Sequence, residues 1–165
     1  MKTIYFAGGC FWGVQRFFDQ FKGVKETTVG YANGKTANPT YQDVKSQESG
    51  HSETVKVDYN SQEISLEKLL DYFYRVIDPT SVNKQGEDEG ISYRTGIYYI
   101  DESDLDVIKA VTAKIQKQYD EPLAVEILPL ENFYNAEEYH QKYLEKNPTG
   151  YCHINISMFN LGEEK

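Results

Sequence analysis

Two kinds of apolar spacing alternate along this chain of 165 residues, and they restrict its fold more than any other feature. Runs typical of strands occupy residues 3–7, 25–31, 53–59, 94–100 and 124–128. Apolar residues at helical spacing mark helices at 14–21, 66–77 and 105–115, and a last short helix is expected over 136–145. Loops are expected over 32–52 and 79–93. Strands interleaved with helices in this way predict an α/β (α+β) fold with helices packed on a mixed sheet.

Length and composition favour a single domain spanning residues 1–165. The chain is long enough to bury one core, and 39% of its residues are hydrophobic. Acidic residues outnumber basic ones by 26 to 17, which disfavours nucleic acid as a partner because phosphate binding needs a basic surface. The sequence holds no apolar stretch of about 20 residues and no signal peptide at its start. We therefore expect a cytoplasmic domain without a membrane partner, irregular from about residue 146.

The stretch "GGCFWG", residues 8–13, places a cysteine where the first strand turns into the first helix. The start of a helix stabilises a thiolate, so this position predicts a pKa for Cys10 below the ordinary value of about 8.5. Such a thiol is a candidate nucleophile, and the alternative is a small buried hydrophobe. Phe11 and Trp12 are either core side chains or an apolar cup beside the nucleophile.

The first residue on the apolar face of the strand at 53–59 is a carboxylate, Glu53. Strict alternation puts Glu53 on the same face as the two valines and the tyrosine of that strand. A desolvated carboxyl there has a raised pKa and keeps a proton that it can donate near pH 7. The alternative is a strand-end side chain that reaches solvent. His51 shares the same parity, and we interpret it as structural.

The chain has two cysteines, Cys10 and Cys152. In a reducing compartment this pair is not expected to form a permanent disulfide, and two thiolates do not complete a zinc site built from cysteines alone. Chemical reactivity is therefore the interpretation we favour for these thiols.

Several separated motifs, in order, resemble the A-type peptide methionine sulfoxide reductases. They are "GGCFWG", "VGYANG", "NPTYQDV", "GHSETVKVDY", "DPTSVNKQGEDEGISYRTGIYY" and "EEYHQKYLEKNPTGYC", and together they cover nearly the whole chain. The resemblance implies a compact two-layer sandwich with a ferredoxin-like core. It also implies reduction of methionine S-sulfoxide, free or in proteins, to methionine for the repair of oxidised proteins.

The resemblance also implies roles for individual residues. Cys10 matches the nucleophile, which becomes a sulfenic acid, and Glu53 matches the proton donor. Cys152 matches the resolving cysteine, which forms a disulfide with Cys10 that thioredoxin then reduces. The residues expected to bind the sulfoxide oxygen, support the site or hold the substrate methyl group are Tyr41, Tyr93, Asp88, Phe11 and Trp12. No cofactor and no metal are expected, and we expect a monomer.

Some features depart from the family pattern. No cysteine follows Cys152, so thioredoxin would attack the Cys10–Cys152 bond directly, and Lys45 stands where some relatives have cysteine. The "GYCHI" segment resembles members fused to a B-type reductase domain.

The residues alone leave two other functions open. One is a thiol peroxidase or acyl hydrolase with a histidine base, for which the chain offers His51, His140 and His153. The other is a binder of methionine-like side chains without catalysis.

Overall fold

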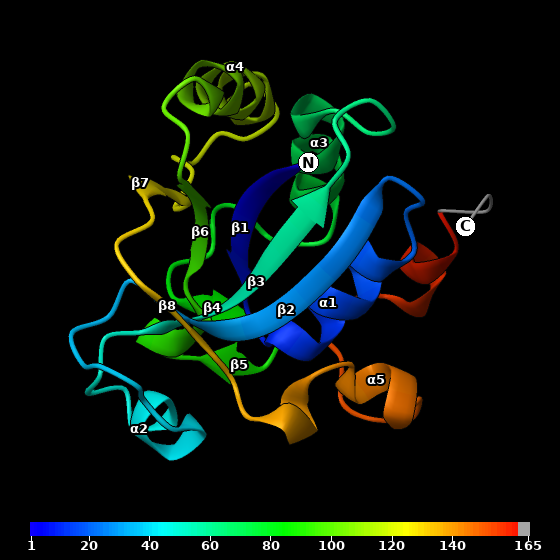
Figure 1. Ribbon diagram of the computed structural model, residues 1–165. Coiled ribbons are helices and arrows are strands. Elements are labelled where there is room, and N and C mark those ends of the chain that lie inside the picture. The colour runs from blue at the N-terminus through cyan, green and yellow to red at the C-terminus, as the bar shows by residue number, and fades with distance from the viewer. Residues whose placement is uncertain (162–165) are drawn as a thin grey trace.

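The computed structural model of the chain describes residues 1–161, and six of its strands form one sheet in the order β7-β6-β1-β3-β2-β8 (Figure 1). Every neighbouring pair in this sheet is antiparallel except β6 and β7, which are parallel. The predicted mixed sheet is therefore confirmed. The strands are β1 Lys2–Gly8, β2 Val24–Ala32, β3 Ser52–Tyr59, β6 Thr95–Tyr99, β7 Glu126–Pro129 and β8 Phe133–Asn135.

The centre of the sheet has the expected ferredoxin-like arrangement. Helix α1 (Phe11–Asp19) connects β1 to β2, and α3 (Leu66–Arg75) lies between β3 and β6 in the chain. Because β1 and β2 flank β3, and β3 and β6 flank β1, each helix links two strands that are separated by a third. This is the split β-α-β-β-α-β unit that the family resemblance implies.

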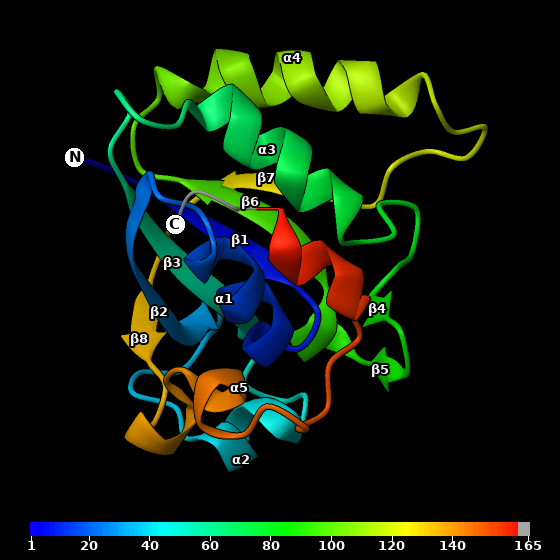
Figure 2. The ribbon, with the colours of Figure 1, turned by 90° about the vertical axis from the view of Figure 1, so that its right-hand side faces the viewer.

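Helices α1 and α3 cover one face of the sheet, which makes two layers. Phe6 of β1 stacks on Phe18 of α1 at 4.8 Å and on Phe73 of α3 at 4.6 Å between ring centroids. Helix α4 (Asp104–Gln116) lies beside α3 (Figure 2). On the opposite face, a smaller cluster around Tyr98 packs against the segment that carries Leu130. The predicted two-layer sandwich is thus confirmed.

The structure contains short elements that the apolar spacing does not predict. Helix α2 (Tyr41–Lys45) lies within the predicted loop 32–52. The predicted loop 79–93 contains a hairpin of β4 (Lys84–Gln85) and β5 (Asp88–Glu89), followed by a 3-10 turn at Ile91–Tyr93. Elements of two to five residues are too short to show a period, because a periodic pattern needs several turns or alternations.

The prediction of a helix over 136–145 is wrong. A 3-10 turn at Glu138–His140 and helix α5 (Tyr143–Lys146) replace it. Between them, the Gln141 amide bonds both the N–H and the carbonyl of Val29 at 3.0 and 2.9 Å, and Lys142 has a φ of +56°. Side-chain bonds to the sheet edge therefore break the helix. Beyond α5 one 3-10 helix covers Ile156–Asn160. No helix among residues 1–161 has the length and apolar character to cross a membrane.

Candidate active site

Cys10 is the N-cap residue of α1, two residues after the end of β1. The turn that presents it depends on Gly9, whose φ is +84° and where a Cβ would lie 2.7 Å from the Cβ of Gln85. The thiol is free, and the residue is only 7% exposed. The predicted position of Cys10 at the start of a helix is therefore confirmed, and the sulfur lies in a buried site.

The prediction that the helix start lowers the pKa of Cys10 is wrong. Burial raises the pKa of this thiol well above its ordinary value, and the Glu53 carboxylate raises it further. The backbone N–H of Trp12 at the helix start has the predicted opposite effect, but it is smaller than the desolvation. Without a bound substrate, Cys10 is therefore a thiol rather than a thiolate near neutral pH.

Glu53 points from β3 toward the first turn of α1. Its Oε1 accepts a hydrogen bond from the backbone N–H of Phe11 at 3.1 Å, and the residue is 3% exposed. Burial raises the pKa of Glu53 to about 8, although the Phe11 N–H and Lys45 oppose the rise. The predicted burial and raised pKa are confirmed, so the carboxyl carries a proton near pH 7.

Two tyrosines from different segments lie near these groups. Tyr41 begins α2, and Tyr93 ends the 3-10 turn at Ile91–Tyr93. Burial raises the pKa of Tyr41 to about 12 and that of Tyr93 well above its ordinary value, and the Glu53 carboxylate adds to both rises. A hydrogen bond between the two phenols opposes the rise at Tyr41. Both phenols therefore keep their protons and are hydrogen-bond donors.

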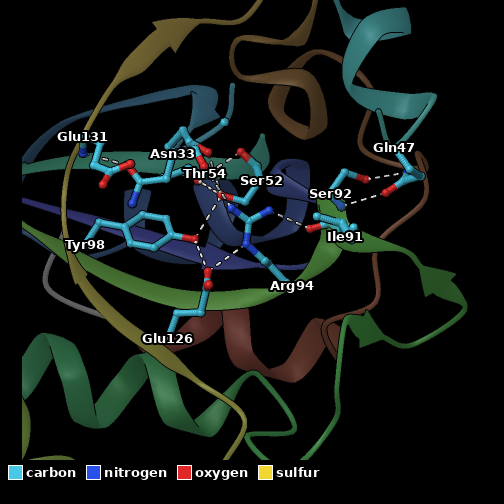
Figure 3. Close-up of polar contacts among 12 residues, drawn as sticks. Asn33, Gln47, Ser52, Thr54, Ile91, Ser92, Arg94, Tyr98, Glu126 and Glu131 are labelled. Carbon is cyan, nitrogen blue, oxygen red and sulfur yellow. Dashed lines mark hydrogen bonds and ion pairs between the residues drawn. The ribbon is translucent and has the colours of Figure 1, made fainter. Parts of the chain in front are cut away.

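Gln47 and Ser92 join the segments that carry these tyrosines (Figure 3). The Gln47 Oε1 accepts from the backbone N–H of Ser92 at 2.8 Å, and its Nε2 donates to the Ser92 Oγ at 2.9 Å. Gln47 follows α2 and has a φ of +71°, and Ser92 is 1% exposed. The sequence carries no local signal for this pair.

Asp88 on β5 is the second carboxylate of the site. Burial raises the pKa of Asp88, and a hydrogen bond from the Tyr151 hydroxyl opposes the rise. The Asp88 charge in turn raises the pKa values of Glu53 and Cys10. Its Oδ2 is buried and has no hydrogen-bond partner among residues 1–161. One oxygen of Asp88 is therefore available to a bound molecule.

Phe11 and Trp12 have different environments. Phe11 is 1% exposed and packs in the core against Tyr31, with ring centroids 5.8 Å apart. Trp12 is half-buried, stacks on Tyr143 at 3.7 Å and donates from Nε1 to Nδ1 of His140 at 3.0 Å. The sequence left open whether these side chains belong to the core or line the site. Phe11 belongs to the core, and Trp12 can form an apolar wall of the site.

Cys152 lies against the first turn of α1. A Cβ on Gly13 would come within 2.6 Å of the Cys152 Sγ, so the glycine leaves room for this sulfur. Cys152 is a free thiol, half-buried, and its charge would raise the pKa of Cys10. The fold thus brings together two cysteines that are far apart in the sequence.

Each of the three histidines hydrogen-bonds a group other than the Cys10 thiol. His51 Nε2 lies 2.7 Å from the Thr36 carbonyl, His140 accepts from Trp12, and His153 Nε2 lies 2.7 Å from the Gly8 carbonyl. A cysteine hydrolase needs a histidine base bonded to the thiol, so this arrangement does not favour that alternative. In residues 1–161, no group of three or more His, Cys, Asp or Glu side chains is arranged to hold a metal ion.

Arg94, which the sequence reasoning missed, fixes the turn that ends in Tyr93 (Figure 3). Its Nε donates to Glu126 Oε1 at 2.7 Å, its Nη1 to the Ile91 carbonyl at 3.0 Å and its Nη2 to the Asn33 carbonyl at 3.3 Å. These bonds connect the turn to β7 and to the end of β2. Only the position of Arg94 next to a candidate site residue could have pointed to it.

Comparison with known proteins places this arrangement among sulfoxide reductases. The family model "Peptide methionine sulfoxide reductase" matches residues 2–163. A peptide methionine sulfoxide reductase MsrA from Lachnoclostridium phytofermentans is 58% identical over 159 residues, which cover 96% of each chain. Reduced Mxr1 from Saccharomyces cerevisiae superposes with a TM-score of 0.88 at 37% identity, covering 93% of this chain and 91% of that one. Mxr1 in complex with Trx2 gives 0.62 at 29% identity, covering 86% and 84%.

Proposed function

This chain belongs to the peptide methionine sulfoxide reductase family, and from this membership we infer that it is an enzyme that reduces methionine sulfoxide to methionine. The observation that carries the mechanism is the buried Cys10 thiol beside Glu53, whose pKa of about 8 leaves it protonated near pH 7. A sulfoxide sulfur is a poor electrophile until its oxygen is protonated or strongly hydrogen-bonded. A nucleophilic sulfur next to a neutral carboxyl meets that need.

Reduction begins when the sulfoxide oxygen accepts hydrogen bonds from Tyr41 and Tyr93 and a proton from Glu53. The Cys10 sulfur attacks the substrate sulfur, and its proton passes to the Glu53 carboxylate, which restores the acid. The bond between the two sulfurs and the S–O bond of the substrate then break as the hydroxyl passes to the Cys10 sulfur. Methionine is released and Cys10 becomes a sulfenic acid, so the substrate sulfur is reduced and the Cys10 sulfur is oxidised. Asp88 supports the site and orients the substrate, while Trp12 forms the apolar wall that holds the methyl group.

Cys152 then resolves the sulfenic acid as a disulfide with Cys10, and thioredoxin reduces that bond by exchange. We expect thioredoxin to attack the Cys152 sulfur of the disulfide, because Cys10 is buried whereas Cys152 is only half-buried. Cys152 also lines a cavity of about 430 Å³ together with Gly150 and Phe159, which gives an external thiol a route to the sulfur. A cycle that needs thioredoxin requires a reducing compartment, so we assign the protein to the cytoplasm.

The substrate of this proposal is the S epimer of methionine sulfoxide, free or within proteins. The test incubates the protein with each resolved epimer and dithiothreitol and identifies the products by mass spectrometry. We expect methionine from the S epimer alone. Comparable turnover of the R epimer would contradict the epimer assignment, and no turnover of either would contradict the proposed reaction.

A further inference from the structure

The neighbours of Cys152 in the chain bind the active-site segments from both sides. His153 Nε2 lies 2.7 Å from the carbonyl oxygen of Gly8, at the end of β1. A carbonyl only accepts, so the imidazole N–H is the donor in this bond. On the other side, the Tyr151 hydroxyl hydrogen-bonds Asp88. The backbone at Cys152 is therefore held between two side-chain anchors.

The His153 side chain fits closely between two glycines. A Cβ on Gly9 would lie 2.9 Å from His153 Nε2, and a Cβ on Gly86 would lie 2.9 Å from the His153 Cβ. Gly9 precedes Cys10, and Gly86 forms the turn between β4 and β5. These two close approaches, together with the bond to Gly8, limit the movement of His153 and of the backbone beside it.

That backbone position determines where the Cys152 sulfur lies. The sulfur packs against Gly13, three residues after Cys10 at the start of α1. Residues three apart at the start of a helix lie on the same face of the helix. The Cys152 sulfur therefore lies over the helix face that also carries Cys10. The Cys152 thiol is itself held by the backbone N–H of Ile154, with an N–S distance of 3.4 Å.

We propose that His153 is a positioning residue for the resolving step, because its hydrogen bond to Gly8 holds the Cys152 thiol beside Cys10. This inference rests on the proposed function. In the step, the Cys152 sulfur bonds to the Cys10 sulfur while the S–O bond of the sulfenic acid breaks. Water leaves with the hydroxyl from Cys10 and the proton from Cys152, and the sulfenic acid is the oxidant.

The contacts of His153 separate this role from one in sulfoxide reduction. The ring bonds a backbone carbonyl and makes no hydrogen bond with Cys10 or Glu53 in the described part of the chain. Loss of the His153 ring should therefore slow the reaction between the Cys152 and Cys10 sulfurs. Oxygen removal by Cys10 needs the substrate, Glu53 and the phenols. Burial lowers the pKa of His153, and the charge of Asp88, which supports the site, opposes this fall, so the test below follows the two steps separately.

The test is a single turnover with methionine S-sulfoxide and no reductant, in which methionine release and Cys10–Cys152 disulfide formation are followed separately by mass spectrometry of quenched samples. His153→Leu keeps bulk but removes the donor. We expect its disulfide formation to slow roughly tenfold to hundredfold, as for a small misplacement of reacting groups, and its methionine release to change by less than about threefold.

Two further variants complete the experiment. His153→Gln keeps an N–H donor of similar reach and should restore much of the rate of disulfide formation, which a purely space-filling role would not predict. Cys152→Ser sets the zero for disulfide formation. Unchanged disulfide formation in His153→Leu overturns the proposal, and so does equal slowing of both steps, which would mean that the ring supports the Cys10 turn. A parent protein that releases no methionine contradicts the proposed function instead.

Discussion

The charge on Glu53 opposes ionisation of Cys10, because both residues lie in one buried site. A protonated Glu53 exerts no such repulsion, and its pKa of about 8 keeps it protonated near pH 7. The proton on Glu53 therefore has two effects: it supplies a donor for the sulfoxide oxygen, and it makes the Cys10 thiolate easier to form. When Glu53 ionises at alkaline pH, both effects are lost together.

The first prediction at this scale concerns Glu53→Gln, which keeps the shape and an N–H donor but has no transferable proton. We expect the sulfoxide reduction step to slow roughly 10²–10⁴-fold, the usual range for general acid catalysis, with much less effect on substrate binding. Single-turnover rates near pH 7 and above measure this. The parent rate should fall as the pH rises through about 8, where Glu53 loses its proton. Equal rates for both proteins near pH 7 would show that Glu53 is not the acid.

Single residues differ in how far the sequence predicts them. The positions of Cys10 and Glu53 follow from local patterns, a helix start and a strand parity, and the structure confirms them. The pKa of Cys10 does not follow, because desolvation depends on groups such as Glu53 that only the fold brings near. Cys152 was assigned by resemblance alone, and no local pattern pointed to the bond between His153 and Gly8.

At the scale of elements, two short segments carry the two phenols. Helix α2 begins with Tyr41, and the 3-10 turn ends with Tyr93. Gln47 joins them through two hydrogen bonds to Ser92 and adopts a left-handed φ of +71°. A residue other than glycine in this conformation is held there by its surroundings, as is common near functional sites. The placement of the two phenols therefore depends on this side chain as well as on the Arg94 bonds that fix the turn.

The second prediction is that Gln47→Gly lowers kcat. Glycine removes both bonds to Ser92 but accepts the positive φ without strain, so the variant should fold. We expect kcat for sulfoxide reduction to fall about tenfold, as misplaced donors stabilise the transition state less. Gln47→Ala, which loses the same bonds but keeps a Cβ at the positive φ, is the comparison for stability.

A double-mutant cycle with Tyr93→Phe shows whether Gln47 acts through the phenol. If it does, Gln47→Gly has a smaller effect on kcat once the Tyr93 hydroxyl is gone. Independent, additive losses in kcat would contradict the positioning role. An effect on thermal stability alone, with kcat unchanged, would contradict it as well.

The same scale shows where sequence patterns succeed and fail. Helices such as α1 and α3 are predicted because each buries one face at a regular period. Helix α2 was missed, although Thr40 and Asp43 form a capping box that the sequence displays. The helix expected over 136–145 is interrupted because Gln141 bonds the edge of β2, a contact between distant residues that no local window contains.

At the scale of the whole molecule, strand pairing brings the site together. Gly8 at the end of β1 pairs with Thr95 at the start of β6. Because β1 and β3 are antiparallel, β3 also begins at this end of the sheet. Cys10 follows β1, Glu53 lies at the start of β3, and Tyr93 precedes β6. Antiparallel pairing alone thus gathers three groups from distant parts of the chain. The element order suggests such a sheet, but only the pairing shows which ends meet.

The buried proton on Glu53 also affects the stability of the whole fold, and this gives the last prediction. In the unfolded chain the carboxyl ionises near its ordinary pKa of 4.5, whereas in the folded protein it ionises near about 8. Between these values the folded state holds the extra proton, so the free energy of unfolding falls as the pH rises, by at most about 1.4 kcal/mol per pH unit from this group. Glutamine has no such dependence.

We therefore expect Glu53→Gln to be more stable than the parent above a pH of about 4.5, with a difference that widens until about 8 and is then constant. Urea unfolding of both proteins at a series of pH values measures the difference, and Glu121→Gln, at an exposed position, is the control. Because the comparison needs no substrate, it tests the buried, protonated state of Glu53 independently of catalysis. A difference that stays constant between these two pH values, or that narrows, would mean that the folded protein holds no extra proton on Glu53 in this range and cannot supply the proton that the proposed reduction requires.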